Sequence, residues 1–246
     1  MKKCIHCGID SDGKYCPECG QEMDIKRLEV KTIFHDVIHG ILHWENSILK
    51  TFRALLSNPG RVAGDYISGL RKSYVRPFTY FIFIQTIYVL FFHWMSGKYF
   101  AFFDITVNNT GTEPEKGEQL QHLIEAYANY LNYFMPLFFA LYFYLFYRKK
   151  TGVNYAESIA LSFYWIGTTL VFGIVLMLLS LIDIRIWNAR IIVNVIFLIF
   201  ATLQFTKLPI FKGILKSLLM IFLSSISYGL FVGLILYIYL HFTSGS

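Results

Sequence analysis

Five long blocks of apolar residues constrain this chain more than any other feature of its sequence. They occupy residues 77–95, 131–147, 158–182, 191–205 and 214–242. A helix rises about 1.5 Å per residue, so about 20 apolar residues cross a hydrocarbon layer about 30 Å thick. Several blocks reach that length, and Trp187 and Ala189 can extend the short fourth block into the membrane interface. The sequence therefore predicts an all-α polytopic membrane protein with about five transmembrane helices, and four or six spans are the alternatives.

The composition argues against a single water-soluble domain. Hydrophobic residues make up 55% of the chain, aromatic residues 18% and charged residues only 15%. One globular core of this size could not hide so much apolar surface, so lipid must cover part of it. The first apolar block follows a polar, cysteine-bearing N-terminal region, so we expect this block to act as a signal anchor rather than as a cleaved signal peptide.

The distribution of Lys and Arg predicts the orientation of the spans. Of the 22 basic residues, 18 lie before the first span or in the loops after the second and fourth spans. Only four fall on the opposite side, namely Lys98, Lys116, Arg185 and Arg190. Basic loops stay in the cytoplasm, so we expect a cytoplasmic N-terminus and an external C-terminus. This bias also explains the net charge of +6 without a nucleic-acid partner.

The chain divides into four zones. We assign residues 1–22 to a zinc-ribbon module, 23–76 to cytoplasmic juxtamembrane amphipathic helices, 77–242 to the transmembrane helical domain and 243–246 to the remnant of a linker. In the second zone, apolar residues recur at helical spacing over 33–42, 48–56 and 61–70. We expect these helices to lie along the membrane surface or to fold beneath the bundle.

The strongest chemical signal is a set of four cysteines in two Cys-x-x-Cys-Gly turns. The set comprises every cysteine in the chain: Cys4, Cys7, Cys16 and Cys19. Four thiolates suit tetrahedral zinc, and a closed four-sulfur site is structural because it leaves no open coordination position. A segment this short has little hydrophobic core, so the metal would supply most of its folding energy. A redox pair or disulfides are the alternatives, and a cytoplasmic location disfavours disulfides.

A row of three histidines with one aspartate offers a second candidate site. His35, His39 and His43 recur every four residues and would share one face of a helix, with Asp36 beside the first. This arrangement could bind a metal or gather protons. The simpler interpretation is the polar face of an amphipathic helix.

Basic residues gather immediately before the first span. They could form a pocket for an anionic lipid headgroup, or they could serve the positive-inside rule alone. The headgroup candidates are Arg53, Arg61, Arg71, Lys72 and Arg76.

Few polar residues lie in or beside the spans, and polar groups are costly in lipid. Gln85, Glu157 and Gln204 are the candidates for an intramembrane polar site, although Glu157 could simply begin a helix. We find no nucleotide-binding or hydrolase motif and no acidic pair within a span, so no catalytic residue is assigned and we expect the protein not to be an enzyme.

Several short segments carry a resemblance to a known family. They include the two cysteine turns, the stretches 58–62 (Asn-Pro-Gly-Arg-Val), 65–69 (Asp-Tyr-Ile-Ser-Gly) and 74–77 (Tyr-Val-Arg-Pro), and 154–158 (Asn-Tyr-Ala-Glu-Ser). Together they resemble the bacterial membrane family named domain of unknown function 3667. Leu70 departs from the base expected there, which weakens the headgroup pocket. The resemblance implies a multi-pass protein of the bacterial inner (cytoplasmic) membrane, and it assigns no activity.

Three functional hypotheses follow from these features. The first is a non-enzymatic inner-membrane protein whose cytoplasmic zinc ribbon is a docking head for a protein or an anionic lipid. The second is a transporter or lipid-translocating protein that uses the polar residues between its spans. The third is a membrane metalloenzyme that uses the histidine row. The sequence leaves the partner and the oligomeric state open.

Overall fold

Helices form nearly all of the regular structure of this protein. The computed structural model describes residues 2–24, 27–30, 45–107 and 131–243. Two short strands, β1 (Lys2–Lys3) and β2 (Asp10–Ser11), pair antiparallel near the N-terminus. The helices that follow are α2 (Glu45–Ser57), α3 (Pro59–Ile67), η1 (Arg71–Ser73), α4 (Pro77–Val107), η2 (Asn132–Phe134), α6 (Met135–Thr151), α7 (Tyr155–Leu179), η3 (Ile184–Asn188), α8 (Ala189–Thr206) and α9 (Ile210–Thr243).

Four helical segments are long and apolar enough to cross a membrane. They are Arg71–Met95, Tyr155–Leu179, Ile184–Thr206 and Ile210–Ile238. This confirms the predicted all-α membrane architecture. The remaining predicted span coincides with α6, whose 17 residues would cover about 25 Å. The five-span count therefore stays a prediction. The first apolar segment ends at Met95, as predicted, although helix α4 itself continues to Val107.

Helix α7 is the centre of the packing. It contacts α4, α6 and α8. Of the residues in its most apolar stretch, 67% are buried, against 17% in the corresponding stretch of α9. Its fully buried Trp165 meets Phe143 of α6 and Phe205 of α8 in edge-to-face contacts. By contrast, α9 leaves large side chains such as Phe211 and Leu230 exposed. Such exposure is expected of a helix whose outer face meets lipid.

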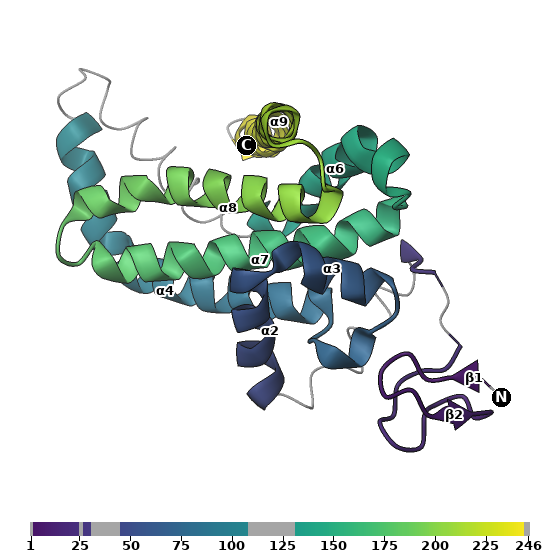
Figure 1. The fold of residues 1–246 in the computed structure, drawn as a ribbon. Coiled ribbons are helices and arrows are strands. Elements are labelled where there is room, and N and C mark those ends of the chain that lie inside the picture. Colours follow the sequence, from purple (N-terminus) through teal and green to yellow (C-terminus); the bar gives the residue numbers. More distant parts are fainter. Residues whose placement is uncertain (1, 25–26, 31–44, 108–130, 244–246) are drawn as a thin grey trace.

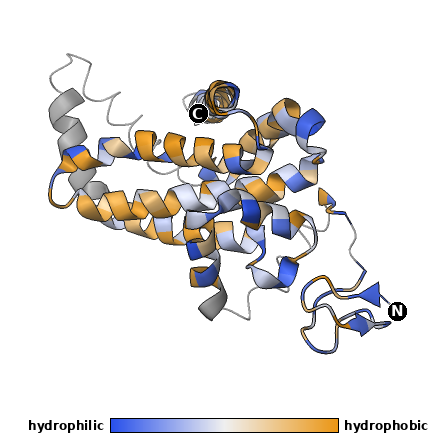
Figure 2. Cartoon of the chain, in the orientation of Figure 1, coloured by the Kyte–Doolittle hydropathy of each residue, from blue (hydrophilic) through white to orange (hydrophobic). Residues whose placement is uncertain are grey.

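The arrangement in space separates a polar end from an apolar body. In Figure 1, α4, α7 and α8 lie side by side, whereas α9 is seen nearly end-on and so crosses them steeply. The N-terminal ribbon, α2, α3, η1 and the α6–α7 turn gather at one end, which we call the head end. Figure 2 shows hydrophilic residues at the ribbon and the head end and hydrophobic residues along α7, α8 and α9.

The juxtamembrane helices belong to the core of this end rather than standing apart from it. The predicted patterns at 48–56 and 61–70 form α2 and α3, and α3 buries Val62, Ala63 and Tyr66 against α7 and α8. The tyrosine ring meets Tyr164 edge-on. The predicted pattern at 33–42 lies outside the described residues.

Candidate metal centre and its docking to the helices

Each pair of cysteines lies on a tight turn closed by backbone hydrogen bonds. The amide of Gly8 donates to the carbonyl of Cys4 at 2.9 Å, and the amide of Gly20 donates to the carbonyl of Cys16 at 2.7 Å. Both glycines have positive φ, +81° and +67°, a region that other residues adopt only with strain. The sequence Cys-x-x-Cys-Gly therefore folds each turn so that its two sulfurs point inward.

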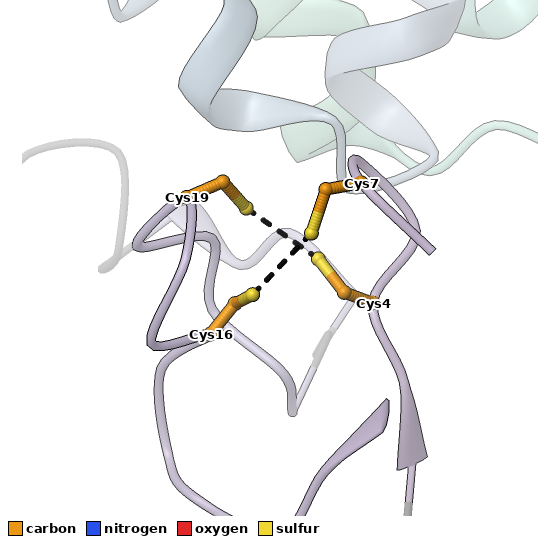
Figure 3. Close-up of side chains that lie close together, drawn as sticks. All are labelled: Cys4, Cys7, Cys16 and Cys19. Atoms are coloured by element: carbon orange, nitrogen blue, oxygen red, sulfur yellow. Dashed lines mark hydrogen bonds between the residues drawn. The ribbon is translucent and has the colours of Figure 1, made fainter. Parts of the chain in front are cut away.

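The four sulfurs converge on one point. All lie within 4.8 Å of one another, with 3.6 Å between Cys4 and Cys19 and 3.4 Å between Cys7 and Cys16 (Figure 3). A tetrahedral zinc with bonds near 2.3 Å needs sulfurs about 3.8 Å apart, so only small shifts are required. None of the four forms a disulfide. The predicted ligands are thus brought together, and the group could hold a metal ion.

The thiols differ in how readily they ionise. A hydrogen bond from the Cys7 amide is the main cause that lowers the pKa of Cys4 to about 6. At Cys7 an amide hydrogen bond from Ile9 acts in the same direction, but desolvation and the neighbouring thiols raise its pKa to about 12. Amides aimed at sulfur stabilise thiolates, and thiolates are the form that binds metal.

Gln21 ties the second cysteine turn to the helices. Its carbonyl accepts from the amide of Cys16 at 2.8 Å, which makes Gln21 part of the turn itself. Its side chain, only 2% exposed, donates to the carbonyl of Gly69 at 2.8 Å and accepts from the amide of Lys72 at 3.4 Å. One side chain therefore bridges the candidate metal site and the turn that leads into α4. We call this contact the Gln21 clamp.

A second contact holds the segment after the ribbon. Arg27 donates from Nε and Nη2 to the carboxylate of Glu157 at 2.8 and 3.1 Å, and from Nη2 to the carbonyl of Gly152. Asn154 donates its side-chain amide to the carbonyl of Leu28 at 3.0 Å, and Leu28 is buried. The carboxylate raises the pKa of Arg27. We call this set of contacts the latch.

Glu157 therefore has two structural tasks at the start of α7. Its carboxylate also accepts from the amide of Asn154 at 2.7 Å, and the Asn154 side chain accepts from the amide of Glu157, which together form a capping box. Only 5% of the Glu157 side chain is exposed, so these donors replace the water that a buried carboxylate needs. This geometry agrees with the alternative that Glu157 begins a helix. The ion pair between Glu157 and Arg27 was not predicted.

Comparison with known protein families finds a match for the segment next to these contacts. Residues 45–89 match a family described as protein of unknown function, DUF3667. The family resemblance expected from the sequence is confirmed. No curated protein and no solved structure matches the chain. The DUF3667 segment contains α2, α3, η1 and the first part of α4, and it includes the Gly69–Lys72 turn that the Gln21 clamp holds.

The predicted headgroup residues lie on the DUF3667 segment, and several already have protein contacts. Arg61 pairs with Asp65 at 3.6 Å while its side chain stays 76% exposed. Arg71 lies over the ring of Tyr66 at 6.0 Å. Lys72 and Arg53 are exposed and Arg76 is half-buried. The ammonium of Lys72 lies beside the ribbon, 3.1 Å from where a Cβ on Gly20 would stand.

Gln204 joins the DUF3667 segment to α8. Its oxygen accepts from the amide of Gly60 at 3.1 Å, and its nitrogen donates to Ser57 and Asn58. Trp165 adds a bond from its indole nitrogen to the carbonyl of Pro59 at 3.2 Å. Thus Gln204 and Glu157 have partners at the head end, while Gln85 is fully buried in α4. His35, Asp36, His39 and His43 lie outside the described residues.

Sequence reasoning missed three residues of this site. Gln21 carried a usable signal, because it directly follows the second Cys-x-x-Cys-Gly turn and therefore moves with it. Asn154 also carried one, because it precedes Glu157 by three residues in the pattern of a capping box. The pairing of Arg27 with Glu157 and the bond from Asn154 to Leu28 had no signal, since each joins segments more than 120 residues apart.

Proposed function

We propose that this membrane protein uses a zinc-loaded ribbon as a docking head on the cytoplasmic face of the bacterial inner membrane. We further propose that a basic edge beside the ribbon contacts anionic lipid headgroups; it consists of Arg53, Arg61, Arg71, Lys72 and Arg76. The Gln21 clamp is the observation that carries the proposal. A freely tethered ribbon would not need a buried glutamine bonded to the turn before the first span. The clamp fixes the ribbon beside Arg71 and Lys72, so the two form one surface.

Zinc is the metal that the donor set favours. Four thiolates are soft ligands that select zinc, copper(I) or iron–sulfur clusters, whereas hard cations prefer oxygen. Zinc has no redox chemistry of its own, which suits a site that serves folding alone. The metal would hold the second turn, and through Gln21 it would orient the ribbon against η1.

The electrostatic argument for lipid rests on where the exposed cations lie. Arg61 of α3 and Lys72 of η1 are exposed, directly before the helix that enters the membrane. Each cation held near an anionic leaflet contributes about 1 kcal/mol. The pair between Arg61 and Asp65 is long and exposed, so it competes weakly with a phosphate.

The test compares two double variants that remove equal charge from the head end. Changing Arg61 and Arg71 to glutamine should lower the anionic phospholipid recovered with the purified protein. Changing Lys149 and Lys150 at the end of α6 to glutamine is the matched control, because both are exposed and neither belongs to the basic edge. Equal lipid recovery from the two variants would contradict lipid binding by the basic edge and leave orientation during insertion as its role.

A protein partner is the second candidate, and the ribbon surface favours it. Ile5, Ile9 and Tyr15 are 45%, 41% and 55% exposed on a module that otherwise carries mainly polar residues. Exposed apolar side chains on a small polar module are common at protein interfaces. A photo-crosslinking residue in place of Tyr15, activated in native membranes, should give a protein adduct under this hypothesis and a lipid adduct under the first.

A transport function draws less support from these contacts. Glu157 and Gln204 each bond to backbone and side chains that join elements at the head end. Their polarity is therefore explained by packing, and the transport alternative rests chiefly on Gln85.

A further inference from the structure

An arginine occupies an unusual position at the end of the helices opposite the head end. Arg190 lies in the first turn of α8, and its Nη1 donates to the hydroxyl of Tyr88 at 3.1 Å. The centre of its guanidinium lies 4.2 Å above the ring of Trp187. The side chain is half-buried. The cation is thus held by an aromatic face and a phenol oxygen.

Three further elements shape the space around this arginine. Tyr88 of α4 is 5% exposed and packs with Met95 and Met177. Gly173 of α7 makes room for it, because a Cβ there would stand 2.9 Å from the Tyr88 ring and 4.0 Å from Cδ of Arg190. Elements α4, α7, η3 and α8 therefore meet at one side chain. This is a supported position, unlike that of a long side chain that simply extends into water.

The charge of Arg190 is not balanced by a carboxylate in the described part of the chain. The salt bridges there join Lys2 with Asp24, Arg27 with Glu157 and Arg61 with Asp65. Arg190 also sits at the positive end of a helix dipole, where a cation is unfavourable. A guanidinium has five N–H donors, and Tyr88 accepts one hydrogen bond. The remaining donors and the uncompensated charge favour an anion.

We propose that Arg190 binds a phosphate group at the membrane interface, in a cradle formed with Tyr88 and Trp187. The planar fork of arginine matches phosphate oxygens in a bidentate way, which an ammonium does not. Tryptophan is enriched at the level of lipid headgroups. Ile182, Ile191 and Ile192 are 82%, 66% and 64% exposed beside the cradle, so acyl chains have an apolar surface to follow. A lipid headgroup and a soluble phosphate share this chemistry.

The experiment uses the full chain purified in detergent, with Arg61 and Arg71 already changed to glutamine to weaken lipid binding at the proposed basic edge of the head end. Native mass spectrometry measures binding of dioctanoyl phosphatidylglycerol and of dioctanoylglycerol, which lacks the phosphate. In this background Arg190→Gln should weaken phosphatidylglycerol binding about tenfold or more, the usual loss for a hydrogen-bonded charge pair. Dioctanoylglycerol binding should not change.

Arg185→Gln is the matched control, because Arg185 is exposed on the preceding η3 and removal of its charge leaves the cradle intact. Arg190→Lys keeps the charge and loses the fork, so it should bind with intermediate affinity. If inorganic phosphate at millimolar concentration displaces the lipid, the site serves soluble phosphate; if it does not, the site serves a headgroup. Phosphatidylglycerol binding by Arg190→Gln that equals that of Arg185→Gln would overturn the proposal.

Discussion

The contact between α3 and α8 leads to a sharp prediction about two glycines in one short helix. A Cβ on Gly60 would stand 2.6 Å from the backbone nitrogen of Phe205 and 2.7 Å from Cβ of Gln204, which is closer than real atoms approach. A Cβ on Gly64, one turn further along α3, would meet nothing within 4 Å. We therefore expect Gly60→Ala and Gly64→Ala to change the stability in opposite directions.

The magnitude follows from the atoms involved. Because backbone atoms face the new methyl group at Gly60, α3 must move away from α8. Overpacking of this kind costs about 1–3 kcal/mol, and the lost hydrogen bond from the Gly60 amide to Gln204 costs about 1 kcal/mol more. Alanine's higher helix propensity offsets less than about 1 kcal/mol of this. At Gly64 the propensity gain acts alone, so the change should stabilise by about 0.5–1 kcal/mol.

Thermal unfolding of the purified protein in one detergent measures both effects. For a chain of this size 1 kcal/mol corresponds to about 2–4 °C in Tm. Gly60→Ala should lower Tm by several degrees, while Gly64→Ala should raise it by about 1–4 °C. Gln204→Ala in the Gly60→Ala background should add little, because the two changes remove the same contact. If the two glycine variants had equal Tm values, the close approach of α3 to α8 would be refuted.

Three other changes test the head and the topology. Cys16→Ser should release the bound metal, so elemental analysis of that variant should find less than one zinc per chain. Arg27→Ala should open the latch and increase amide hydrogen exchange around Gly152, with no loss of metal, and unchanged exchange would mean that the latch does not form. A single cysteine introduced at Thr243 should react with an impermeant reagent in sealed cells, whereas one at Thr151 should react only after permeabilisation; the reverse pattern would contradict the predicted orientation.

The sequence predicted those features that depend on local spacing. The cysteine turns could be read directly, since the residues between the ligands fix where the sulfurs point. Helical spacing likewise predicted α2 and α3, and hydrophobic length predicted the four apolar segments, although helix α4 continues beyond its apolar segment to Val107. Local spacing could not predict that Gln204 bonds to the Asn58–Gly60 turn or that Arg27 pairs with Glu157. Both contacts depend on how segments far apart in the sequence pack together.

The latch also has a consequence for the order in which the protein is built. The partners of the Gln21 clamp, Gly69 and Lys72, leave the ribosome soon after the ribbon, because 48 and 51 residues separate them from Gln21. Glu157 follows Arg27 by 130 residues. At about 5–20 residues per second, translation delivers this carboxylate roughly 7–26 s after the arginine. The ribbon can therefore fold and form the Gln21 clamp while the later spans are still being made. The latch can close only after the first turn of α7, which carries Glu157, has been synthesised.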